Sequence, residues 1–141
     1  MQFDQRQTLL FQSAQLARLL SLRLREKLVP VGVQPAQAAA LIEIGLDEGL
    51  TQKQLVERLE VEQPGVARTL NGLEAEGWIT RQGLGGRAQG LYLTDKARAV
   101  VPGAIAATAE TDREVLGGLS RTEQAHLLDA LQELIAGLKR A

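Results

Sequence analysis

Apolar residues recur with helical spacing near the N-terminus of the chain. Leucines fall every four residues from Leu16 to Leu28, and further leucines widen the apolar surface beyond one stripe. The pattern predicts a helix that begins at about Phe3 and is ended by Pro30 and Gly32. Its own domain can cover only part of so broad an apolar surface, so we expect a partner chain to cover the rest.

A second broad apolar face lies near the C-terminus. Ser120 and Glu123 stand at the spacing of a capping box, which predicts the start of a helix there. Leucines and Ile135 then fill one face of that helix. With the N-terminal helix it is expected to form a helical dimerisation region, which we assign to residues 3–30 and 97–141.

A helix over about 96–116 is predicted to join this region to the middle of the chain, with Asp95 as its N-cap. Pro102 and Gly103 lie inside it and should kink or interrupt it. Alanines that would let another helix approach closely follow at positions 104, 106, 107 and 109. A pair of glycines then ends the helix.

The middle of the chain carries shorter helical patterns. Pro35 suits the first turn of a helix expected over about 35–46. Thr51 and Gln54 have capping-box spacing, so another short helix is expected from there to about Glu60.

Two poor helix formers, Pro64 and Gly65, open the next helical pattern. Pro64 fits the first turn, where its missing N–H leaves no bond unmade. Val66, Leu70 and Leu73 then form a stripe that should face the core. The opposite face is small and polar and consists of Gln63, Gly65, Ala67, Arg68, Asn71 and Gly72. Such a face suits a DNA major groove, because helix N-termini attract phosphate and arginine or asparagine can contact base edges. An ordinary solvated helix has the same composition, so these residues alone leave both interpretations open.

A short hairpin is predicted directly after this helix. Gly77 ends the helix, and strands are expected over 78–80 and 91–94. The connection contains four glycines and Arg87, a residue type that narrow minor grooves attract. Arg81 at its base has two open interpretations, a DNA contact or an ion pair with a neighbouring acid. Helix, turn, helix and basic hairpin together predict a winged helix-turn-helix lobe over residues 34–96.

Composition and charge narrow the function classes. The chain has 45% hydrophobic and 23% charged residues, as expected for an ordinary soluble protein. It has no cysteine, which excludes disulfides, thiolate metal sites and cysteine redox sensing. The net charge is −1, but residues 81–98 hold four basic residues against one acid. Neither a signal peptide nor a membrane-spanning run is recognisable, so a cytoplasmic location is expected.

Catalytic and metal-site motifs are missing from the sequence. His126 is the single histidine, which leaves neither a nucleophile–histidine–acid set nor a metal-ligand pair. Glu74 and Glu76 are two residues apart on a helix and point to different faces. The glycine-rich connection lacks the spacing and lysine of a P-loop. We therefore expect neither an enzyme nor a bound metal or cofactor.

The order of these motifs resembles the MarR family of bacterial transcription regulators. The run "LTQKQLVERLEVEQPGVARTLNGLEAEGWITR" is similar to that family's helix-turn-helix, and "LYLTDKA" to the end of its wing. The run "GGLSRTEQAHLLDALQELI" is similar to its terminal dimerisation helix. The resemblance covers essentially the whole chain, as a single mainly α domain with a small β-hairpin wing.

The resemblance implies a homodimer that binds a pseudo-palindromic operator on double-stranded DNA, most often as a repressor. It also implies that a small-molecule effector can release the DNA. Pro64, Arg68 and Asn71 fall on the recognition helix, and Arg87 matches the wing arginine. The chain departs from the family at Gly85, where the wing usually carries Asp, and at Glu62, which replaces the usual Ser or Thr N-cap.

Two alternatives remain open at this stage. A winged helix can serve protein–protein contact without DNA, and an apolar patch around Gln63, Gly65, Arg68 and Asn71 would favour that use. A regulator can also bind DNA constitutively, without any effector.

Overall fold

A computed structural model describes residues 2–141 of the chain. It contains a 3₁₀ turn, six α-helices and one two-stranded antiparallel sheet within those residues. The elements in order are η1 (Gln5–Gln7), α1 (Leu9–Leu28), α2 (Pro35–Leu46), α3 (Gln52–Leu59), α4 (Gln63–Ala75), β1 (Ile79–Gly83), β2 (Gln89–Leu93), α5 (Asp95–Leu116) and α6 (Arg121–Arg140).

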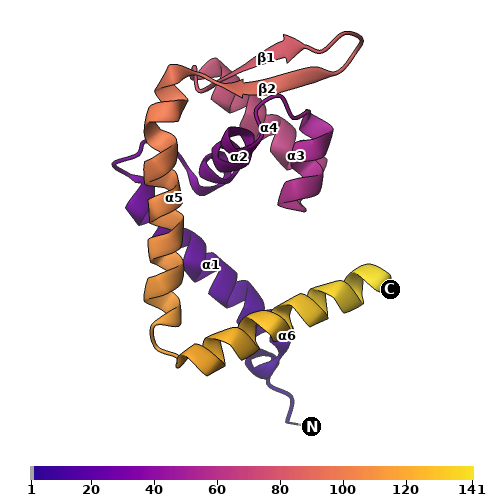
Figure 1. The fold of residues 1–141 in the computed structure, drawn as a ribbon. Helices are drawn as coiled ribbons and strands as arrows, with labels where there is room; N and C mark the ends of the chain where they lie inside the picture. The colour runs from indigo at the N-terminus through magenta and orange to yellow at the C-terminus, as the bar shows by residue number, and fades with distance from the viewer. Residues whose placement is uncertain (1) are drawn as a thin grey trace.

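The helices form two parts, a lobe and a separate helical frame that consists of α1, α5 and α6 (Figure 1). Helices α2, α3 and α4 and the β1–β2 hairpin make up the lobe, which carries most of the buried core. Helix α5 leaves the hairpin and runs away from the lobe with α1 packed along it. Helix α6 turns back at the far end of α5 and projects as an arm. None of the described helices combines the length and apolarity needed to cross a membrane.

The lobe core confirms the apolar stripes predicted from the sequence. Its largest fully buried side chains come from every element of the lobe and from the end of α1: Leu28, Leu41, Ile44, Leu55, Leu70, Leu73, Ile79 and Leu91. The capping boxes also form as predicted. The Thr51 hydroxyl accepts from the Gln54 N–H at 3.2 Å, and the Ser120 hydroxyl accepts from the Glu123 N–H at 3.1 Å.

The start of α1 differs from the prediction of a helix from Phe3. A 3₁₀ turn over Gln5–Gln7 comes first, and α1 starts only at Leu9. The reason is a cap, because the Thr8 hydroxyl accepts a hydrogen bond from the Phe11 N–H at 3.1 Å. A side-chain oxygen at this position ends the preceding turn and begins a new helix.

The sequence predicted Asp95 as the N-cap of α5, but the N-cap is Thr94, one residue earlier. Thr94, not Asp95, has the extended cap conformation, and its hydroxyl accepts from the Ala97 N–H at 3.3 Å. Asp95 lies in the first turn instead, where its carboxylate pairs with Arg98 at 3.1 Å. Threonine can also donate, and the same hydroxyl donates to the Gly77 carbonyl at 2.8 Å. This second bond ties the start of α5 to the end of α4.

Helix α5 is not interrupted at Pro102, although an interior proline costs about 3 kcal/mol. Packing on both sides of the proline explains the continuity. Ala97 and Ala104 are fully buried, and a Cβ on Gly103 would lie 3.3 Å from the Val31 side chain. Small residues thus let α5 lie close to the lobe and to the end of α1, and this burial offsets the missing hydrogen bond.

The hairpin is longer than the two predicted strands. Ile79 pairs with Leu93 at its base, and Gly83 pairs with Gln89 near its tip. The segment before α3 runs along the other edge of β2, because the Gly49 N–H donates to the Leu91 carbonyl at 2.8 Å. In return the Leu91 N–H donates to the Leu50 carbonyl at 2.9 Å. The wing is therefore anchored to the lobe by a pair of backbone hydrogen bonds along one edge of β2.

This anchoring requires glycine at position 90. A Cβ there would lie 2.9 Å from the Gly49 carbonyl oxygen, too close for any alanine. We expect Gly90→Ala to lower the free energy of unfolding by about 1–3 kcal/mol, because the strand must shift away from its neighbour. Urea denaturation measures the change. Gly83→Ala is the matched control, since a Cβ at Gly83 meets nothing within 4 Å. Equal losses in both variants would contradict this account of the wing.

Candidate nucleic-acid interface

Helix α4 is held by its apolar stripe and displays the opposite face. Val66, Leu70 and Leu73 are at most 4% exposed, as predicted. On the other side Gln63, Pro64, Arg68 and Asn71 are exposed, whereas Gly65, Ala67 and Gly72 are half-buried. Pro64 lies in the first turn, as expected.

Glu62 is the N-cap of α4 and makes no side-chain capping bond. The first backbone N–H groups of α4 therefore donate no hydrogen bond to the Glu62 side chain. Such groups carry the positive end of the helix dipole and attract anions such as phosphate. The helix thus begins with an uncapped, exposed end.

Arg81 joins three elements of the lobe. Its guanidinium donates to the Asn71 side-chain oxygen at 3.0 Å, to Gln52 at 3.2 Å and to the Glu74 carboxylate at 3.3 Å. Its side chain is only 18% exposed. Of the two interpretations that the sequence left open for Arg81, the structure shows the ion pair. The planar fork of arginine suits this role, because it can bond several acceptors at once.

Two of the four basic residues within 81–98, Arg81 and Arg98, are paired with carboxylates in the fold. Arg98 pairs with Glu48 at 2.9 Å and with Asp95 at 3.1 Å. Lys96 donates to the Glu76 carbonyl at 2.7 Å and lies 4.0 Å from the centre of the Trp78 ring. Arg87 differs, as no carboxylate among residues 2–141 lies within ion-pair distance of it.

The wing tip explains the departure from the family at Gly85. Gly85 has φ +80°, a left-handed conformation that an aspartate adopts only with strain. The usual wing Asp would therefore strain this backbone, although a Cβ at position 85 would meet no atom within 4 Å. Arg87 follows two residues later and is exposed, without a carboxylate beside it to hold its side chain.

Trp78 is buried at the junction between α4, the hairpin and α5. It is 7% exposed, and its ring N–H donates to the Glu76 carboxylate at 3.1 Å. The same carboxylate accepts from Gln37 of α2 at 3.1 Å. Sequence reasoning missed Glu76 and Gln37, because only the fold brings positions 39 residues apart together.

These elements define a winged helix-turn-helix lobe carried on a helical frame. Residues 31–88 match the model of the MarR family. The chain is 37% identical over 90 residues to the uncharacterized HTH-type transcriptional regulator YwoH of Bacillus subtilis (strain 168), a match that covers 63% of this chain and 66% of that protein. The chain belongs to the MarR family of winged helix-turn-helix transcription regulators.

Solved structures support the fold over most of the chain. The transcriptional regulator SlyA superposes with a TM-score of 0.84 at 23% identity, covering 93% of this chain and 94% of that one. A putative MarR family regulator of Listeria monocytogenes, solved with a 26mer DNA, gives 0.83 at 22% identity, covering 94% and 89%. A MarR family protein of Mycobacterium tuberculosis, solved with salicylic acid, gives 0.68 at 23% identity, covering 90% and 96%.

The bonds of Arg81 lead to a test of its role. Arg81→Lys keeps the charge but cannot bond Asn71, Gln52 and Glu74 together, so we expect a loss of unfolding free energy on the order of 1 kcal/mol. Chemical denaturation measures it. Arg87→Lys, the same change elsewhere in the wing, should stay within about 0.5 kcal/mol of the unmodified chain. If both variants are as stable as the unmodified chain, Arg81 does not hold the wing.

Proposed function

We propose that this protein is a homodimeric, DNA-binding repressor that recognises a pseudo-palindromic operator. The observation that carries the proposal is the orientation of α4, whose apolar stripe is locked in the core while its polar face and uncapped N-terminus are exposed. A major groove admits one helix, and small side chains let the helix backbone approach the bases. The exposed face is polar, which favours DNA over protein docking.

In this proposal each residue of the interface has its own role. Arg68 and Asn71 contact base edges, and Gln63, Pro64 and Gly65 bring the start of α4 close to the phosphate backbone. Arg87 reaches the adjacent minor groove. Arg81 acts as a positioning residue, since its bonds to Asn71 and Glu74 of α4 set the direction of the wing. Asn71 keeps its amide N–H groups as donors, because Arg81 occupies only its oxygen.

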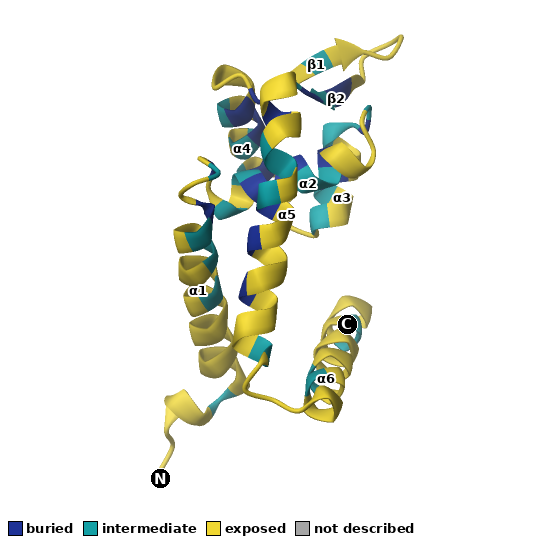
Figure 2. Cartoon of the chain, turned by 60° about the vertical axis from the view of Figure 1, so that its left-hand side comes forward, coloured by how far each residue is buried: buried dark blue, intermediate teal, exposed yellow. Residues whose placement is uncertain are grey.

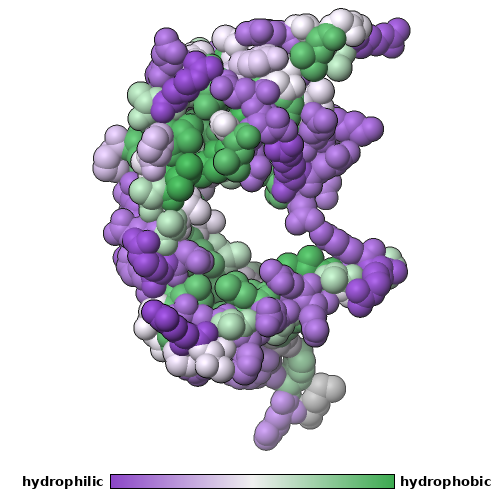
Figure 3. All heavy atoms as spheres, viewed as in Figure 1, coloured by the Kyte–Doolittle hydropathy of each residue, from purple (hydrophilic) through white to green (hydrophobic). Residues whose placement is uncertain are grey.

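The homodimer is inferred from apolar surface that one chain leaves open. No residue of α6 is buried, and Figure 2 shows that arm as mostly exposed with a few intermediate positions. Figure 3 shows hydrophobic residues along the α6 arm and around the adjoining base of α1 and α5. Exposed large side chains on α1 and α6 include Leu10, Leu16, Leu19, Leu128, Leu134, Ile135 and Leu138. Monomeric proteins rarely expose this much apolar surface, so we infer that a second copy of the chain buries these side chains.

The same proposal includes an effector site between the frame and the lobe. A cavity of about 450 Å³ lies there, lined by α1, α2 and α5 through Leu20, Leu24, Ile42, Ile105 and Thr108 among others. Its lining is mainly aliphatic, with Thr108, Thr111 and Asp112 as its polar members. A ligand there would change the spacing of the two recognition helices and select states with different DNA affinity. A structural neighbour, CouR from Rhodococcus jostii RHA1, was solved with p-coumaroyl-CoA, which shows that this fold can hold small molecules.

Two arginine variants test the DNA contacts. Arg68→Ala should weaken operator binding by about 1–3 kcal/mol and relax sequence preference, because a base contact is lost. Arg87→Ala should weaken binding to all sequences. It should also reduce the slope of log K against log salt concentration by about one for each wing. Gel-shift titrations with the upstream region at several salt concentrations measure both. Arg121→Ala, at the start of α6 far from the lobe, is the control. If all three variants bind like the unmodified chain, these roles are wrong.

Light scattering tests the homodimer. At micromolar concentration the unmodified chain should show about twice its mass of 15.2 kDa. Leu134→Glu places a charge on the apolar face of α6 and should yield a monomer or an aggregate. His126→Glu adds the same charge on the other side of that helix and should leave the dimer intact. A stable unmodified monomer would overturn the proposed assembly.

A further inference from the structure

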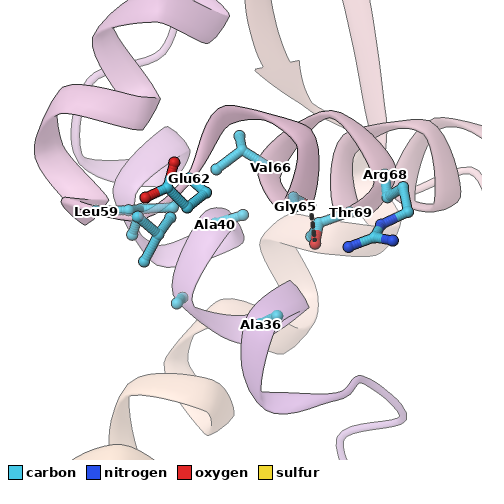
Figure 4. A pocket seen from close by; sticks show the side chains of 10 residues that line it. Ala36, Ala40, Leu59, Glu62, Gly65, Val66, Arg68 and Thr69 are labelled. Atoms are coloured by element: carbon cyan, nitrogen blue, oxygen red, sulfur yellow. Dashed lines mark hydrogen bonds between the residues drawn. The ribbon is translucent and has the colours of Figure 1, made fainter.

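Arg68 and Arg87, the two unpaired arginines proposed to contact DNA, are supported in different ways. Arg68 belongs to α4, whose buried stripe fixes the helix, and Figure 4 shows it on that helix next to Thr69. Arg87 lies in the connection between β1 and β2, which projects away from the helices in Figure 1. No carboxylate among residues 2–141 is within ion-pair distance to hold Arg87. Its direction must therefore come from the connection itself.

The tip that carries Arg87 is short and has little stiffness of its own. The Leu84 N–H donates to the Ala88 carbonyl at 3.2 Å, and three residues, 85–87, lie beyond this bond. Two of the three are glycines, with φ of +80° and +116°. Glycine loses more conformational freedom on ordering than any other residue. The order of the tip therefore depends on how firmly Leu84 and Ala88 are held.

The Leu84 side chain lies against the buried Gly90 of β2. Gly90 pairs with Gln82, and Leu84 comes two residues after Gln82, so the alternation of side chains places all three on one face of the hairpin. A Cβ on Gly90 would lie 3.1 Å from Leu84 Cδ2, which shows that this methyl group occupies the space beside the glycine. Residues 83–89 are exposed, whereas Gly90 is buried.

Tyr92 and the lobe enclose Gly90 from its other sides. A Cβ on Gly90 would lie 3.0 Å from Tyr92 Cε2 and 2.9 Å from the carbonyl oxygen of Gly49, which precedes α3. Leu84 itself is 46% exposed, so about half of its surface is covered although it lies at the edge of the tip. Such diagonal contacts between paired strands stabilise a hairpin. Leu84 thus connects the glycine-rich tip to the part of the hairpin that is bonded to the lobe.

We propose that Leu84 is a positioning residue for Arg87, because its contact beside Gly90 and Tyr92 holds the wing tip in one direction. The reach of Arg87 into a minor groove rests on the proposed function, whereas the ordering of the tip does not. At Gly85, where the family usually carries Asp, this chain has no carboxylate to orient a basic side chain. An apolar contact orders the tip instead, and salt does not screen such a contact as it screens an ion pair.

Amide NMR relaxation of the full chain tests the ordering of the tip without DNA. Leu84→Ala removes the methyl groups beside Gly90, so the order parameters of residues 85–87 should fall from higher values in the unmodified chain to below about 0.6. Leu84→Met keeps an apolar contact and should restore them. Leu46→Ala is the matched control, because Leu46 ends α2 outside the hairpin and is 70% exposed.

Two relaxation results would overturn the proposal. One is equal order parameters at residues 85–87 in Leu84→Ala and in the unmodified chain. The other is a loss of order at these residues in the unmodified chain at about 1 M NaCl, because that would identify a screened charge as the cause.

A double-mutant cycle on DNA binding separates this inference from the proposed function. With the upstream region as duplex probe, Leu84→Ala should raise the Kd about threefold to tenfold, because Arg87 must then be ordered on binding. Arg87→Ala should raise the Kd by a smaller factor in the Leu84→Ala background than in the unmodified chain. Equal factors in both backgrounds would refute the positioning of Arg87. If the unmodified chain binds no DNA but Leu84→Ala still loosens the tip, the proposed function fails and the ordering by Leu84 stands.

Discussion

Three side chains of α4, Val66, Leu70 and Leu73, fix the orientation on which the other functional features depend. Full burial of such a side chain contributes about 1.5–3 kcal/mol to the free energy of unfolding. Rotation of α4 about its own axis would expose these side chains and is therefore strongly disfavoured. Because the stripe points inward, Arg68 and the uncapped helix start point away from the core. The same orientation brings Asn71 and Glu74 within reach of Arg81, so the wing takes its direction from the recognition helix.

Local sequence signals predicted most of the fold. Helix α2 has the predicted bounds, and the caps at Thr51 and Ser120 form, since capping depends on residues three positions apart. The predictions were wrong where contacts between segments distant in the sequence determine the local structure. Thr94 replaced Asp95 as a cap while also bonding the end of α4, and helix α5 passes through Pro102 because packing on the lobe and α1 holds it. Neither contact can be recognised from the local spacing of apolar and polar residues.

The candidate site was harder to predict than the fold, because charge in a sequence does not show which charges are already paired. The basic stretch around the wing suggested a positive footprint, yet Arg81 and Arg98 are held by acids and Lys96 by a backbone carbonyl and Trp78. Arg68 and Arg87 keep no such partner within residues 2–141. Affinity for DNA would therefore depend on the fit of α4 and on a few unpaired cations.

We propose that two copies hold their recognition helices at the pitch of duplex DNA, and the distance between the two helices can be measured. The chain has no cysteine, so Glu62→Cys, directly before α4, gives one spin label per copy at an exposed position to which no DNA contact is assigned. Pulsed electron spin resonance should give a distribution centred near one duplex turn, about 34 Å, that narrows when operator DNA is added. Absence of any dipolar coupling, or a distance far from one turn in the presence of DNA, would contradict the account.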